Sequence, residues 1–127
     1  MQKTRKEYTE ANRIAWDEAA SRHAAHNNEA LFAAVRDPSY VSFDGEILTT
    51  LQSVGVAGRH VIQLGCNNAR ETLSLRNLGA ARCVGVDASV EFLAHGREML
   101  RIAGAETQVE LLEADVPARL LLLSATL

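Results

Sequence analysis

The sequence has few of the residues that mark secreted, membrane-bound or metal-binding proteins. Its two cysteines, Cys66 and Cys83, form no CxxC pair and have no metal-ligand spacing, so we expect free thiols in a reducing cytoplasm. The N-terminal stretch MQKTRKEYTEANR has charges but no apolar centre, which argues against a signal peptide. No apolar run approaches the roughly 20 residues that span a bilayer. These absences predict a soluble cytoplasmic protein with no membrane partner.

A strong charge of either sign is also missing. The 127 residues carry a formal net charge of -3, and 47% are hydrophobic against 23% charged. This composition is typical of a globular protein and gives no electrostatic reason to expect a nucleic-acid partner. The length suits one domain, which we assign to residues 1–127. His23 and His26 are spaced i,i+3, but no third ligand is in view, so we expect no metal site.

Glycine and proline are absent from the chain before Pro38, and the stretch that precedes it is rich in alanine and glutamate. We therefore predict a helix from about Thr4 to Val35, within a leader segment of residues 1–36. Spacings of three and four bring a set of mostly polar and aromatic side chains onto one face of this helix. They are Tyr8, Asn12, Trp16, Ala19 and His23.

After a short amphipathic helix around residues 47–54, strand and helix patterns alternate. The expected elements are a strand at His60–Leu64, a helix ending near Leu78, a strand at Cys83–Val86, a helix capped by Ser89 and ended by Gly104, and a strand at Gln108–Leu112. Short links between alternating elements predict a parallel α/β sheet covered by helices on both faces. Residues 60–116 form its βαβαβ core.

The stretch VIQLGCNNARETL, residues 61–73, runs from an apolar strand through a small polar turn into a helix. In open α/β sheets, ligands bind beyond the carboxyl ends of the strands. Gly65 allows close backbone approach, and Asn67 and Asn68 tolerate a left-handed backbone. The helix that follows would point its amide-rich end at the same place. The turn is therefore predicted to hold a polar or carboxylate-bearing cofactor.

Asp87 ends the second predicted strand, 22 positions after Gly65. An acid at that place binds ribose hydroxyls in nucleotide-type sites, and Ala88 leaves space for a flat base. Cys66 could act as a nucleophile, but no paired base is apparent, so we interpret it as a small residue that lines a tight turn.

Two parts of the sequence together resemble one enzyme family. VIQLGCNNARETLSLRNLGAARCVGVDAS followed by VELLEADV is similar to the first half of a class I S-adenosylmethionine-dependent methyltransferase. NRIAWDEAASRHAAHN resembles the leader helix of its bacterial small-molecule branch, and the resemblance covers roughly Tyr8 to Val116. It implies a Rossmann-like parallel sheet with the family's strand order 3-2-1, an N-terminal helical lid, S-adenosylmethionine as cofactor, and methyl transfer to a small-molecule acceptor.

The resemblance also implies a cofactor site, assigned residue by residue. The residues that would border the methionine part are Gly65, Cys66 and Asn67. Those around the nucleoside would be Asp87 for the ribose and Ala88, Asp115 and Val116 for the adenine. Those that close the site from above would be Tyr8 and Trp16, with Asn12. No catalytic residue is implied, because the segment that normally supplies the general base has no counterpart.

The turn departs from the family pattern, acid-x-Gly-x-Gly-x-Gly. The corresponding residues are Gln63, Gly65, Asn67 and Ala69, so one glycine is kept. Gln63 can form hydrogen bonds but lacks the charge that would attract the cofactor's amine. Ala69 places a methyl group where the backbone is expected to pack most tightly.

The resemblance ends after the third strand, and the remaining sequence is VPARLLLLSATL. We expect a fold truncated there, with the strand at His60–Leu64 at a sheet edge. Either the leucine tail acts as a substitute strand, or a homo-oligomer or partner chain covers that edge. The sequence does not decide between a helix and a strand for the tail, since Pro117 suits a helix start but the apolar run is short.

Two other functions remain open. The chain could be a non-catalytic module that keeps the fold or the cofactor half-site and acts as a structural or regulatory partner. It could also be a nicotinamide-dependent oxidoreductase, although the single glycine of the turn, its asparagines and the leader helix speak against that class.

Overall fold

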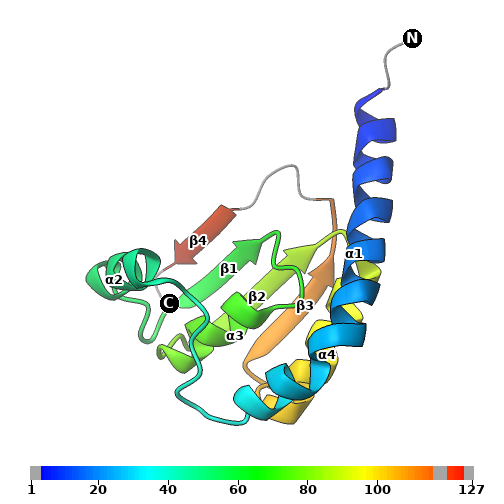
Figure 1. Ribbon diagram of the computed structural model, residues 1–127. Helices are drawn as coiled ribbons and strands as arrows, with labels where there is room; N and C mark the ends of the chain where they lie inside the picture. Colours follow the sequence, from blue (N-terminus) through cyan, green and yellow to red (C-terminus); the bar gives the residue numbers. More distant parts are fainter. Residues whose placement is uncertain (1–3, 116–119, 125–127) are drawn as a thin grey trace.

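The computed structural model describes residues 4–115 and 120–124, with all their side chains except those of Trp16, residues 19–28 and residues 120–124. After two N-terminal helices, strands and helices alternate as far as β3, and a further strand, β4, completes the element order (Figure 1). The elements are α1 (Arg5–Ala34), α2 (Gly45–Val54), β1 (His60–Leu64), α3 (Arg70–Asn77), β2 (Arg82–Asp87), α4 (Val90–Ala103), β3 (Val109–Glu113) and β4 (Leu120–Ser124). The predicted α/β fold is therefore confirmed.

The long helix α1 starts and ends where the sequence predicts. The Thr4 hydroxyl accepts a hydrogen bond from the Glu7 amide at 3.2 Å, and Glu7 accepts one from the Thr4 amide at 2.7 Å, which completes a capping box. The C-terminal half of α1 runs along α4, whereas its N-terminal half extends beyond the sheet (Figure 1). In the described part of the chain, no helix has both the length and the apolar character needed to cross a membrane.

The sheet has the order β3-β2-β1-β4, in which β1, β2 and β3 are parallel. Its register aligns Val61 with Cys83 and Cys83 with Val109. The connecting helix α4 begins at Ser89, whose hydroxyl accepts a hydrogen bond from the Phe92 amide at 3.2 Å. This order brings the carboxyl ends of three adjacent strands to one edge of the sheet.

The leucine tail forms a strand, which settles the choice between strand and helix. β4 pairs antiparallel with β1, from His60 opposite Ser124 to Leu64 opposite Leu120. The sheet thus continues one strand beyond the three expected, and the chain's own β4 occupies the edge of β1. A homo-oligomer or partner chain stays a prediction, but the uncovered edge that motivated it is not present.

Helices cover one face of the parallel sheet, so the prediction of cover on both faces is wrong. Val61, Cys83 and Val109 are buried on the face that α3 and α4 cover. On the other face Ile62 is 39% and Leu112 45% exposed. The reason is topological: the chain moves through the sheet in one direction, from β1 to β2 to β3, and crossovers of one hand then place both helices on the same side. Cover of the second face needs a reversal of that direction.

Candidate functional site

The turn between β1 and α3 has an unusual backbone that repeats at every second residue. Gly65, Asn67 and Ala69 have φ angles of 79°, 51° and 68°, all in the left-handed region. The amides of Gly65 and Cys66 both donate to the Val86 carbonyl, at 2.7 and 3.0 Å. The turn is therefore fixed against the end of β2, and its shape does not depend on glycine alone.

Ala69 is an alanine in a left-handed conformation, which its own propensity does not favour. It is fully buried and takes the N-cap position of α3 without a side-chain hydrogen bond to the helix amides. A left-handed conformation costs an alanine about 1–2 kcal/mol. Backbone strain of this kind persists where the packing of the surrounding residues imposes the conformation. Strained residues are frequent at binding and catalytic sites.

Asp87 joins the two loops at the carboxyl ends of β1 and β2. Its Oδ2 accepts a hydrogen bond from the Asn67 amide at 2.8 Å, and its Oδ1 accepts one from the Ser89 amide at 2.9 Å. The side chain is 7% exposed. Each carboxylate oxygen has a second acceptor position, so two further hydrogen bonds are chemically available. The sequence located this acid but did not predict that it clamps the protein's own backbone.

The residues assigned to the adenine lie at the same edge. Ala88 follows Asp87 directly and is half-buried. The Ala114 amide donates to the Asp87 carbonyl at 3.0 Å, which brings the exposed Asp115 to the end of β3 next to β2. Val116 lies outside the described residues. The sheet therefore places Asp87, Ala88 and Asp115 near one another, as parallel strands require.

The leader helix brings a residue that was not predicted to this edge of the sheet. Tyr8 is 59% exposed on α1, and the side chain of Trp16 lies outside the description. Asp17, the next residue, accepts hydrogen bonds from the Ser89 hydroxyl and, at 3.4 Å, from the Glu91 amide. It therefore lies at the start of α4, beside Asp87. Sequence reasoning missed Asp17, and no local pattern links it to a residue 72 positions away.

A polar cavity of about 270 Å³, which we call the loop cavity, opens beside the β1–α3 turn. Its lining residues are Ser42, Cys66, Asn67, Asn68, Arg70 and Glu71. The Ser42 amide donates to the Ser74 hydroxyl at 2.9 Å, which holds the segment before α2 against α3. Cys66 is 3% exposed, and the described residues that line the cavity include no histidine, so they do not provide a cysteine–histidine pair.

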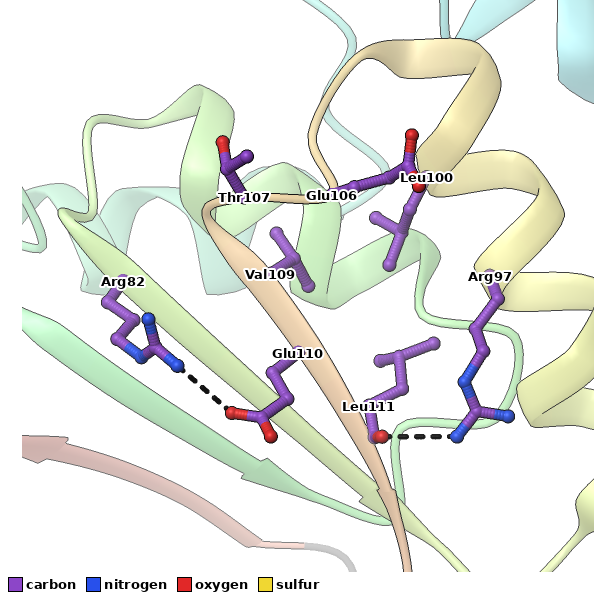
Figure 2. Close-up of a pocket in the computed structure, with 8 residues that line it drawn as sticks. All are labelled: Arg82, Arg97, Leu100, Glu106, Thr107, Val109, Glu110 and Leu111. Carbon is purple, nitrogen blue, oxygen red and sulfur yellow. Dashed lines mark hydrogen bonds and ion pairs between the residues drawn. The ribbon is translucent and has the colours of Figure 1, made fainter.

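A larger cavity of about 390 Å³, the edge cavity, lies along β3 (Figure 2). Arg82 and Glu110 form an exposed ion pair at 3.0 Å on its rim, and Arg97 donates to the Leu111 carbonyl at 3.1 Å. The cavity begins at Thr107, before β3, near the amino ends of the strands. Ligands of open α/β sheets bind at the opposite ends, so the smaller loop cavity is the better candidate despite its size.

The other cysteine, Cys83, is unsuited to act as a nucleophile. Burial raises the pKa of the Cys83 thiol to about 11, against a smaller opposing effect of Arg76, so this thiol stays protonated at neutral pH. Among the described residues, no group of three or more His, Cys, Asp or Glu side chains could hold a metal ion.

The chain matches no protein-family model and no curated protein sequence. What the structure defines is an α/β protein with N-terminal helices and a three-strand parallel sheet with interleaved helices. A fold of this kind hosts many unrelated functions, so the function of the protein depends on the residues of its site.

Proposed function

We propose that this chain binds S-adenosylmethionine at the β1–α3 turn and takes part in methyl transfer to a small-molecule acceptor. The observation that carries the proposal is the backbone of the turn. The family pattern has glycine at the positions of Gly65, Asn67 and Ala69, and glycine is the default residue where φ is positive. All three positions have positive φ here, although two of them are not glycine. The two positions that lack glycine thus adopt a backbone conformation for which glycine is the usual residue.

The residues around the turn fit the cofactor's chemistry. Among the described residues, each oxygen of Asp87 accepts one hydrogen bond, and its second acceptor position suits a ribose hydroxyl. Ala88 and Asp115 lie at the same sheet edge, where a flat base with an amino group could lie against a small side chain and a carboxylate. When bound, S-adenosylmethionine would supply an electrophilic methyl group on its sulfonium, to which a nucleophile of the acceptor would bond as the carbon–sulfur bond breaks and the thioether leaves. The chain's part is to bind and orient, which is the main source of rate in such a displacement.

Calorimetric titration of the full chain tests the proposal. S-adenosylhomocysteine should bind saturably, and NAD should bind at least 100-fold more weakly. The Ala88→Leu variant would fill the space assigned to the base, so it should lose at least tenfold in affinity while keeping its melting temperature. Ala94→Leu, an exposed position on α4, is the matched control. Failure of wild-type protein to bind S-adenosylhomocysteine at about 1 mM would refute the proposal.

One observation favours a second candidate, a non-catalytic module. Both oxygens of Asp87 already bind backbone amides, and the side chain is largely buried, as expected of a structural clamp. A radiolabelled methyl group distinguishes the two functions. Transfer from S-adenosylmethionine to a component of a small-molecule extract indicates an enzyme, whereas binding without transfer in any oligomeric state indicates the module.

A further inference from the structure

The position that the family pattern gives to an acid is occupied by a glutamine whose amide is fixed. Gln63 is 9% exposed, and its Oε1 accepts a hydrogen bond from the Thr72 hydroxyl at 2.6 Å. This bond orients the amide so that its Nε2 donates to Glu71 Oε1 at 3.3 Å. A carboxylate is therefore present next to position 63, but it comes from α3 rather than from β1.

Glu71 and Arg70 both line the loop cavity, so one acidic and one basic residue border the same space. Within the described part of the chain, neither residue forms an ion pair with another side chain. The hydrogen bond from Gln63 uses one oxygen of Glu71, and the other oxygen keeps its acceptor positions. One charge of each sign in one polar cavity is complementary to a zwitterion.

We infer that the loop cavity binds the α-amino-acid group of the proposed cofactor, with its ammonium on Glu71 and its carboxylate on Arg70. This inference rests on the proposed function and assigns two residues that the family pattern does not. Hydrogen bonds between ionised partners are about twice as strong as those between neutral groups, and they give the cavity its selectivity. Glu71 replaces the charge that Gln63 lacks, and Gln63 holds Glu71 in place.

Two ligands that differ in the amino-acid group test the inference on the full chain. S-adenosylhomocysteine carries this group, and 5′-methylthioadenosine has the same nucleoside and a thioether without it. Wild-type protein should bind the first at least tenfold more tightly by calorimetry. Glu71→Gln should weaken S-adenosylhomocysteine at least tenfold and leave 5′-methylthioadenosine within twofold, and Arg70→Gln should do the same.

Glu91→Gln is the matched control. Glu91 is the second residue of α4, as Glu71 is the second residue of α3, and it is exposed outside the loop cavity. The two substitutions remove the same charge from the first turn of a helix at the same edge of the sheet. Glu91→Gln should leave both affinities within twofold, and melting curves should show each variant folded.

The possible outcomes separate the inference from the proposed function. If wild-type protein binds S-adenosylhomocysteine but Glu71→Gln leaves that affinity unchanged, the inference fails and the function stands. If Glu71→Gln weakens both ligands equally, Glu71 only supports the turn, and the inference again fails. Equal wild-type affinity for the two ligands would also overturn it. If wild-type protein binds neither ligand, both proposals fall.

Discussion

Asp17 of α1 accepts a hydrogen bond from the hydroxyl of Ser89, the N-cap residue of α4. The same hydroxyl accepts a hydrogen bond from the Phe92 amide, so Ser89 caps its own helix and holds another. Asp17 also forms an ion pair with Arg13 at 2.9 Å. This contact fixes the leader helix at the carboxyl edge of the sheet, where the proposed site lies.

The first prediction concerns this contact. Asp17→Ala should lower the free energy of unfolding by about 1–2 kcal/mol, because it removes a charged acceptor from the buried hydroxyl of Ser89. Amide hydrogen exchange in α1 should accelerate, whereas exchange in β1 and β2 should not. Glu18→Ala, an exposed neighbour on the same helix, is the control and should change stability by less than about 0.5 kcal/mol. Equal exchange in both variants would show that Asp17 does not anchor α1.

The second prediction concerns the left-handed turn. Asn67→Ala should destabilise the protein by about 1 kcal/mol, because alanine tolerates a φ of 51° less well than asparagine. Asn67→Gly should stay within about 0.5 kcal/mol of wild type, since glycine adopts this region freely. Asn68 is outside the left-handed region, so Asn68→Ala should cost less than Asn67→Ala. Urea unfolding measures all three, and a larger loss at residue 68 would contradict the strain argument.

The third prediction concerns the close approach of α4 to the turn. A Cβ at Gly96 would lie 2.8 Å from the Asn68 carbonyl oxygen and 3.0 Å from Leu111 Cδ1. Gly96→Ala should therefore displace backbone and cost about 1–3 kcal/mol. It should also weaken the binding of S-adenosylhomocysteine, because Asn68 lines the loop cavity. The control is Gly45→Ala, where a Cβ meets nothing within 4 Å, and that variant should be neutral or slightly stabilised.

The fourth prediction is a pH dependence that arises from Cys83. The pKa of its thiol is raised from 9.0 to about 11 by burial, so the folded state holds the proton more tightly than the unfolded state. The contribution of Cys83 to stability is complete below pH 9 and is lost as the pH rises through 11. Between these values wild-type protein should lose about 1–2 kcal/mol more than Cys83→Ala. Parallel alkaline slopes for the two proteins would contradict it.

Helix and strand boundaries were predictable because local chemistry determines them. Ser89 and Gly104 mark the ends of α4, and the structure places a side-chain cap at the first and a left-handed residue at the second. The absence of glycine and proline before Pro38 likewise identified α1. These signals lie within a few residues of the feature they predict.

Features that depend on distant parts of the chain were not predictable in this way. The left-handed conformation of Ala69 contradicts its own propensity and depends on the packing around it. The contact of Asp17 with Ser89 depends on where α1 lies in the folded protein. The sequence located Gln63 and Asp87 correctly on strands, but not the partners that their polar atoms would find.

The hydrogen bonds of Asp87 belong to a continuous series of hydrogen bonds, which we call the relay. Asn67 donates to Asp87, which accepts from Ser89, and Ser89 donates in turn to Asp17 on the leader helix. The relay makes the 30-residue helix and the five-residue turn mechanically interdependent, since a shift of the turn alters every bond along it. A spectroscopic probe on α1 would then report when the turn is occupied.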